Sequence, residues 1–147
     1  MGSVMFSTEK HLSNWLKKAT GGHWVRIENN VGTGVPDVNY AFQGTEGWTE
    51  LKVCRRKIIT YDTVIKLKVR PAQYAWLMER HKYNGNCSIT IGFTQGFVMI
   101  VPPENLRLLM EPEGARAGHL GLLIEATKSN WPVIAAQYKR LYEDKHS

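Results

Sequence analysis

The chain has 147 residues, 43% of them hydrophobic and 22% charged, a balance that is typical of a folded globular protein and excludes wholesale disorder. It is long enough to bury one core without disulfides, and Cys54 and Cys87 lack metal-ligand spacing, so we expect a single domain over residues 1–147 with two reduced thiols. No run approaches the roughly 18 apolar residues of a membrane span, and residues 1–10 show neither a basic leader nor an apolar stretch, so we expect a cytoplasmic protein without a membrane partner.

A first helix is predicted to begin after Ser7 or Thr8, either of which can cap it, and to end at Gly21-Gly22. Its apolar side chains recur at the spacing of one helix face, at Leu12, Trp15, Leu16 and Ala19. Glu9 stands three residues before the first of these and is expected on the same face. An acid there is costly unless it is paired or binds a metal, whereas an acid in a first turn simply complements the helix dipole. Both interpretations of Glu9 stay open.

Three strands are predicted next, over residues 23–28, 38–42 and 48–53. A glycine-containing loop separates the first two, and a turn at residues 44–47 joins the second and third into a hairpin. Glu28, Asn29 and Asn30 precede the glycines. We interpret them as a strand end and turn, with an approach to DNA or a metal as the alternative.

The segment that follows has a strict alternation. Val64, Lys66, Lys68 and Arg70 are expected to face one way, and Ile65, Leu67 and Val69 the other. Residues 61–63 can turn the chain before this run, so we expect a hairpin or arm over residues 57–70. An ordinary edge strand protected by its lysines is the alternative.

Pro71 suits the first turn of a second helix, whose predicted stripe is Tyr74, Leu77, Met78 and His81 and whose end is Asn84-Gly85. Two strands, a short helix and a glycine-rich loop are expected at 87–93, 97–101, 104–110 and 111–121. Asn130 is expected to cap a last helix with one apolar face, formed by Trp131, Ile134, Ala135, Tyr138 and Leu141. That face either closes the core or serves as a dimer interface. The order of elements predicts an α/β fold with helices flanking a central mixed sheet.

The positive charge is concentrated in one segment. Residues 52–70 carry seven basic side chains against the single acid Asp62, a balance of +6 that equals the net charge of the whole chain. A polyanion binds such a patch, whereas a merely solvated face normally mixes both signs. We therefore expect a nucleic-acid surface in which phosphates contact Arg55, Arg56, Lys57, Lys66, Lys68 and Arg70.

Other binding chemistry is not expected. The histidines are scattered without ligand spacing, which argues against zinc, and no phosphate-loop motif indicates a nucleotide cofactor. The five tryptophans, with Trp48 and Trp76 among them, fit core positions better than a base-stacking platform.

Three residues carry the chemistry. Glu50 and Lys52 are two apart in a predicted strand, so their side chains leave the same face. Asp37 opens the preceding strand, and pairing of the two strands brings it to the same end of the hairpin as Glu50. Two carboxylates beside an ammonium form a site that suits Mg²⁺, which often uses only one or two protein carboxylates together with substrate phosphate. Such a metal polarises a phosphate and activates water, and Lys52 can position that water or stabilise the transition state.

The run Gly34-Val35-Pro36-Asp37, followed after thirteen residues by Glu50-Leu51-Lys52, resembles the signature of the PD-(D/E)XK nuclease superfamily. Within it the pattern is most similar to the VRR-NUC group and its Holliday junction resolvase relatives. The resemblance covers about residues 7–101 and implies a restriction-endonuclease-like αβββαβ core. In compact members the Glu-x-Lys strand leads almost directly to the next helix. Here a basic insertion, about 54–70, intervenes, and an extension, about 102–147, adds a C-terminal helix.

The resemblance also implies functional properties. Asp37, Glu50 and Lys52 would be catalytic, with Mg²⁺ or Mn²⁺ as the cofactor. A first-helix glutamate joins the metal site in these families, and Glu9 matches that location. Gln73 matches a glutamine that these families often carry on the helix over the site, although an exposed helix glutamine is the alternative. Resolvase-like members act on branched DNA as homodimers, and small standalone members are frequent in phages.

Two rival functions remain. One is another reaction on the same scaffold: a restriction-like nuclease, one specific for single strands, or one that acts on RNA. The other is a non-catalytic DNA-binding module. Retention of Asp37, Glu50 and Lys52 argues against the second, because an idle site has no physical need to hold two carboxylates beside a lysine.

Overall fold

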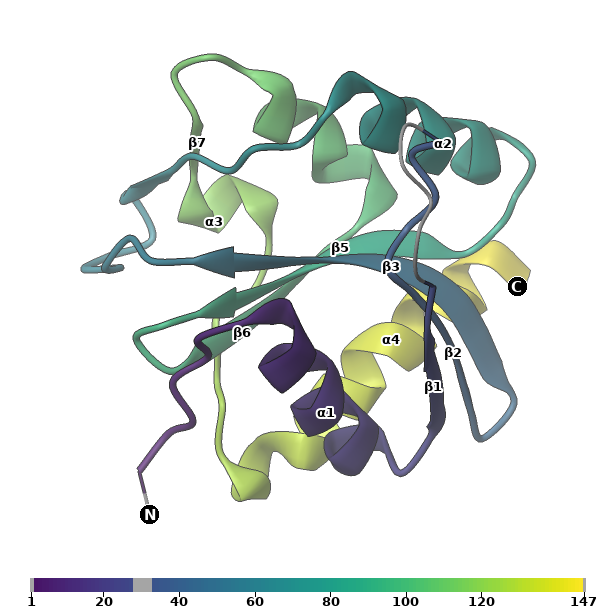
Figure 1. Cartoon of the computed structure of the whole chain (residues 1–147), viewed down its shortest axis with the longest axis horizontal. Helices are drawn as coiled ribbons and strands as arrows, with labels where there is room; N and C mark the ends of the chain where they lie inside the picture. Colours follow the sequence, from purple (N-terminus) through teal and green to yellow (C-terminus); the bar gives the residue numbers. More distant parts are fainter. Residues whose placement is uncertain (1, 28–32, 147) are drawn as a thin grey trace.

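A computed structural model gives the structure of residues 2–27 and 33–146 (Figure 1). Its centre is a six-stranded sheet in the order β1-β2-β3-β5-β6-β8. The strands are β1 (His23–Arg26), β2 (Val38–Phe42), β3 (Thr45–Cys54), β5 (Cys87–Phe93), β6 (Phe97–Val101) and β8 (Ile124–Glu125). Strands β3 and β5 pair in parallel, whereas every other neighbouring pair in this sheet is antiparallel. The predicted mixed sheet is therefore confirmed.

Helices cover both faces of the sheet (Figure 1). One face carries α1 (Glu9–Thr20) and α4 (Trp131–His146). The other carries α2 (Pro71–Lys82), the 3₁₀ helix η1 (Pro103–Met110) and the short α3 (Ala117–Leu120). A short 3₁₀ turn, η2 (Lys128–Asn130), precedes α4. Each face thus closes its own hydrophobic core. None of the described helices combines the length and apolar character that crossing a membrane requires.

Helix α1 forms as its sequence predicts. The Thr8 hydroxyl caps it by accepting the backbone N–H of His11 at 3.0 Å, and Gly21 ends it in the left-handed conformation, with φ of 64°. The predicted stripe is buried: Leu12, Trp15, Leu16 and Ala19. Helix α4 buries Ile134 and Tyr138 in the same core, with the rest of its predicted apolar face packed around them. The apolar face of α4 therefore helps to close the core, as one of its two predicted roles requires.

The β2–β3 hairpin differs from its prediction at the turn. Gln43 and Gly44 both have positive φ, 48° and 77°, and they form a two-residue turn between Phe42 and Thr45. Such tight turns suit the right-handed twist of paired strands. Strand β3 therefore begins at Thr45, three residues earlier than the expected start at residue 48. The prediction placed the turn at residues 44–47 because that run contains two glycines. Gly47, however, lies inside the strand, against the ring of Tyr40.

The basic insertion does not pair with itself, so of its two predicted forms, hairpin or arm, the hairpin is wrong. Its only strand is the short β4 (Val64–Ile65), which pairs antiparallel with β7 (Ala115–Arg116) of the C-terminal extension. The expected glycine-rich loop at 111–121 therefore contains β7 and α3. The predicted alternation nevertheless holds. Ile65 and Val69 are buried, and the intervening Lys66 and Lys68 are exposed. The segment is thus anchored along its length with its cations facing outward.

Candidate active site

The β2–β3 register brings Asp37 and Glu50 together. Val38 pairs with Thr49, so Asp37, one residue before Val38, lies beside Glu50. The Asp37 backbone N–H donates to Glu50 Oε1 at 3.1 Å. In return, the Leu51 N–H donates to Asp37 Oδ2 at 3.1 Å. Each carboxylate therefore accepts a hydrogen bond from a backbone N–H beside the other carboxylate, which orients the two toward one another.

Gln73 completes a hydrogen-bonded cluster from the first turn of α2. Its Nε2 donates to Glu50 Oε2 at 2.6 Å, and its Oε1 accepts the Lys52 ammonium at 3.1 Å and the Arg70 backbone N–H at 3.0 Å. Gln73 is 6% exposed, so the alternative of an ordinary exposed helix glutamine is wrong. Lys52 Nζ also lies 3.5 Å from Glu50 Oε2. One buried amide thus links the acid and the base of the predicted motif.

The loop before Asp37 begins with Gly34, at a position that only glycine can occupy. Its φ is +75°, a conformation that L side chains rarely adopt. A Cβ at this position would lie 2.0 Å from the carbonyl oxygen of Ala72, in the first turn of α2. The loop that leads to Asp37 therefore lies directly against the turn that holds Gln73. Glycine is required for that close approach.

The electrostatics of the cluster centre on Glu50. Burial and, next, the neighbouring Asp37 carboxylate raise the pKa of Glu50 from 4.5 to about 7, while Lys52 and the hydrogen bond from the Asp37 backbone oppose the rise. Glu50 is 3% exposed. Two carboxylates and one ammonium leave an excess of negative charge in a desolvated place. A divalent cation with oxygen ligands would relieve that excess, so the donor set of Asp37 and Glu50 fits Mg²⁺.

Glu9 is an exposed residue in the first turn of α1, capped by Thr8, so the prediction that it lies on the buried apolar face is wrong. The helix turns that face toward the sheet only from Leu12 onward. Within residues 2–27 and 33–146 no group of three or more His, Cys, Asp or Glu side chains is close enough to hold a metal ion. A metal role for Glu9 stays a prediction. Glu28, Asn29 and Asn30 lie outside the described residues.

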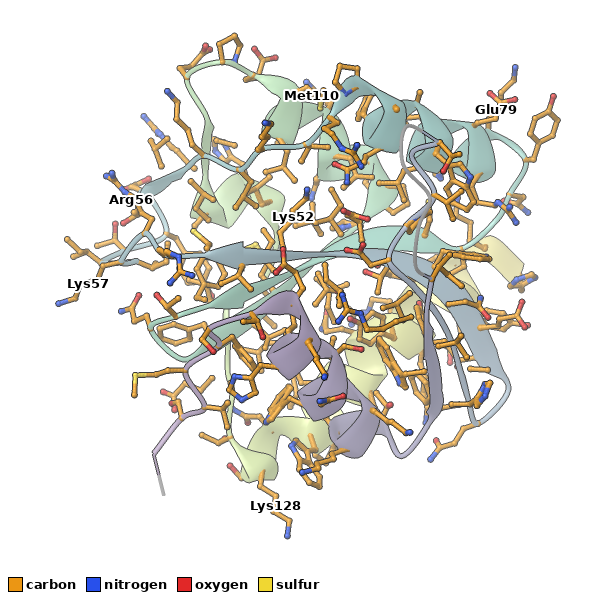
Figure 2. All side chains as sticks on the ribbon, in the orientation of Figure 1. Lys52, Arg56, Lys57, Glu79, Met110 and Lys128 are labelled. Carbon is orange, nitrogen blue, oxygen red and sulfur yellow. The ribbon has the colours of Figure 1, made fainter. Side chains whose placement is uncertain are left out.

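The basic insertion begins and ends at the cluster. Arg55 follows Lys52 by three residues, and the backbone of Arg70 donates to Gln73. Figure 2 shows Lys52 on β3, two residues before the carboxyl end of the strand, with Arg56 and Lys57 beyond that end. The six predicted phosphate contacts are all exposed: Arg55, Arg56, Lys57, Lys66, Lys68 and Arg70. In the part of the chain that the structure describes none of them forms an ion pair. Asp62, the single acid of this segment, pairs with Arg116 instead, with 3.9 Å between Asp62 Oδ1 and the Arg116 guanidinium.

Trp48 and Trp76 were predicted at core positions, and in the structure both pack against the core on the α2 face while staying half-buried. Trp48 projects from β3 on the same side as Glu50 and Lys52, and Trp76 follows Gln73 by one turn of α2. Strand parity and helical spacing from Glu50 and Gln73 were the signals that could have placed them beside the site.

Comparison with solved structures shows a shared fold. The chain matches the 1.6 Å structure of Archaeoglobus fulgidus Hjc, a Holliday junction resolvase from an archaeal hyperthermophile, with a TM-score of 0.59. The match covers 88% of this chain and 96% of that chain, at 16% sequence identity. No protein-family model and no curated protein sequence matches the chain. The likeness shows the restriction-endonuclease-like fold that the sequence predicted.

Proposed function

We propose that this chain is a Mg²⁺- or Mn²⁺-dependent endodeoxyribonuclease of the PD-(D/E)XK superfamily, with branched or otherwise structured DNA as its substrate. The observation that carries the proposal is the buried cluster of Asp37, Glu50, Lys52 and Gln73 on a fold shared with a resolvase. Within the superfamily the motif is most similar to the VRR-NUC group. An exposed basic segment that begins and ends at the cluster supports DNA as the partner.

Each residue of the cluster has a separate role in the proposal. Asp37 and Glu50 would hold the cation, which supplies polarisation of the scissile phosphate and a more acidic bound water. Lys52 donates to the phosphate or orients the attacking water, because its ammonium stands beside Glu50 at 3.5 Å. Gln73 is a positioning residue that holds Glu50 and Lys52 in fixed orientation through its two amide atoms.

The surrounding charges serve binding. The six exposed cations of the insertion would contact phosphates without reading sequence, so binding is expected to fall steeply with salt. A homodimer suits a four-way junction, which presents two symmetry-related strands to cut.

The experiment is cleavage of an end-labelled four-way junction by the full chain. With Mg²⁺ the wild type should cut, whereas with EDTA it should bind without cutting. The variant Glu50→Gln should also bind without cutting. The matched control is Glu125→Gln, which removes an exposed carboxylate from another strand of the same sheet and should leave cleavage unchanged. Cleavage by Glu50→Gln at the wild-type rate would refute the assigned site.

A panel of DNA substrates separates the remaining functions. Preference for flaps or junctions over continuous duplex supports the branched-substrate proposal. Preference for duplex, single strands or RNA would indicate the rival nucleases on the same scaffold. Binding without cleavage of any substrate by the wild type, with Mg²⁺ or Mn²⁺ present, would indicate a non-catalytic DNA-binding module.

A further inference from the structure

A seam of paired side chains runs between β3 and α2, which point in opposite directions (Figure 1). At its middle, Gln73 contacts Glu50 and Lys52. One helical turn further along α2, Trp76 meets Trp48, with ring centroids 5.4 Å apart and planes inclined by 57°. Trp48 precedes Glu50 by two residues on the same strand face, a separation of about 7 Å along the strand. The aromatic pair is therefore the direct continuation of the candidate active site.

Arg80 covers this aromatic pair. Its guanidinium carbon lies 4.6 Å from the centroid of the Trp76 ring and 5.9 Å from that of Trp48. Gly85 makes the placement sterically favourable, because a Cβ there would lie only 2.3 Å from Arg80 Cδ. Arg80 itself is exposed, and among the described residues it forms no ion pair. A planar cation is thus held against two indole rings at the surface.

Two hollows flank Arg80 on the molecular surface. One, of about 430 Å³, is lined by Trp48 and Arg80 among other residues, and the other, of about 350 Å³, is lined by Trp76, Arg80 and Tyr83. Tyr83 is 72% exposed, and its ring lies 5.6 Å from the ammonium of Lys82. Aromatic faces and cations therefore meet in open hollows, which is the combination that single-stranded nucleic acid uses for stacking.

At this end of the seam the acids Glu46 and Glu79 offset the cations Arg80 and Lys82, so an uncharged base suits it better than a phosphate. Glu46 lines the first hollow, and Glu79 lines the second. Figure 2 shows Glu79 near the end of α2. Carboxylates repel a phosphodiester but not the uncharged face of a base. The opposite end of the seam, beyond Lys52, carries the exposed cations of the insertion. The two ends thus differ in chemistry, with backbone-binding cations on one side of Glu50 and aromatic faces on the other.

We propose that Trp48, Trp76 and Arg80 form a stacking site for an unpaired base next to the phosphate bound at Glu50. The proposal rests on the proposed nuclease function, and it narrows the substrate to DNA in which duplex meets unpaired nucleotides at the cut. In this proposal duplex phosphates lie along the insertion, and the first unpaired base stacks on the Arg80 guanidinium and the Trp76 indole beneath it. Continuous duplex cannot use this site, because its bases are stacked on one another.

The test compares binding of two DNA molecules in EDTA, where no cleavage occurs. One is a blunt duplex, and the other is the same duplex with a short single-stranded extension that carries 2-aminopurine at its first unpaired position. The wild type should bind the extended DNA more tightly and quench 2-aminopurine. Trp76→Leu should weaken binding of the extended DNA about tenfold, the loss of one stacked base, while blunt-duplex binding stays within about twofold.

Trp131→Leu is the matched control. Trp131 is also half-buried, with the ammonium of Lys128 5.5 Å from its ring, but it lies on α4, on the other face of the sheet. The Trp131→Leu variant should bind both DNA molecules like the wild type. Trp76→Tyr, which keeps an aromatic ring, should retain most of the affinity for the extended DNA that Trp76→Leu loses. If Trp76→Leu does not fold, Arg80→Gln takes its place with the same expected selectivity.

Three results would overturn the stacking site: no quenching by the wild type, equal weakening of both DNA molecules by Trp76→Leu, or no weakening by a folded Trp76→Leu. Failure of the nuclease proposal has a different signature. In that case Mg²⁺ produces no cleavage, while selective binding in EDTA is retained.

Discussion

The buried Glu50 should make the metal-free protein less stable as the pH rises, and Glu50→Gln should remove that dependence. Burial and the Asp37 carboxylate raise the pKa of Glu50 from 4.5 to about 7 in the folded state. Between these values the folded chain keeps a proton that the unfolded chain has released. The unfolded state therefore binds fewer protons, and the free energy of unfolding falls with pH over this window.

The size of the effect follows from the two pKa values. The interval from 4.5 to about 7 corresponds to about 3 kcal/mol at 1.36 kcal/mol per pH unit. This is a large share of the total stability of a domain, which is about 5–15 kcal/mol. Below pH 4.5 the penalty is absent, and above pH 7 it is complete. At pH 8 Glu50→Gln should gain up to about 3 kcal/mol over the wild type, less the lost attraction to Lys52.

The assay is urea unfolding at pH 5, 6, 7 and 8 in EDTA, with Glu125→Gln as the control for loss of an exposed carboxylate. Other titrating groups are shared and cancel in the difference between variant and wild type. Mg²⁺ at 100 times its dissociation constant should then stabilise the wild type at pH 8 by about 2.7 kcal/mol and Glu50→Gln much less. If the difference in free energy of unfolding between Glu50→Gln and wild type does not change from pH 5 to pH 8, the pKa of Glu50 is not raised in the folded state.

Three further perturbations test the site and its surroundings. Gly34→Ala should destabilise the protein by about 1–3 kcal/mol in thermal unfolding and slow cleavage, because the added Cβ meets the first turn of α2. Gly44→Ala is the control: its φ is similarly positive, but nothing lies within 4 Å of the added Cβ. It should show only the cost of the positive φ and leave cleavage unchanged. Lys66→Ala combined with Lys68→Ala should weaken binding of all DNA sequences and reduce the slope of log affinity against log salt by about two, whereas an unchanged slope would separate the insertion from the DNA. Lys52→Met should raise the pKa of Glu50 further, because Lys52 lowers it. The pH at which the free energy of unfolding, measured in urea, stops falling should therefore move upward. If that pH does not change, the Lys52 ammonium does not act on the Glu50 carboxylate.

Most of the secondary structure was predictable because local patterns and packing agree. The stripe of α1, the ends of β2, β5 and β6, and the alternation around Ile65 all follow from spacing that one buried face imposes. The proximity of Asp37 and Glu50 was predictable for the same reason, since it depends only on two adjacent strands and a short turn.

The errors arose where distant contacts decide the structure. Gly47 looks like a turn residue in the sequence, but the ring of Tyr40 requires a glycine inside β3. The partner of β4 is β7, some fifty residues further along the chain, and no local pattern specifies that pairing. The burial of Gln73 likewise depends on the approach of Gly34 to α2, a contact that spacing alone does not reveal.

The position of the insertion would let it set the substrate choice of the proposed nuclease without disturbing the cluster. The hydrogen bond from Lys52 to Gln73 joins the residues that flank the insertion. It holds β3 and α2 in the same relative position whatever segment lies between them. Lengthening a closed loop costs little free energy, because loop entropy grows only with the logarithm of length. Ile58 and Val69 anchor the insertion in the core around η1, so its cations are carried on an ordered segment. If the proposed function holds, DNA bound at Glu50 would meet these cations on one side and Trp48 and Trp76 on the other, which would favour a substrate whose strands differ on the two sides of the cut.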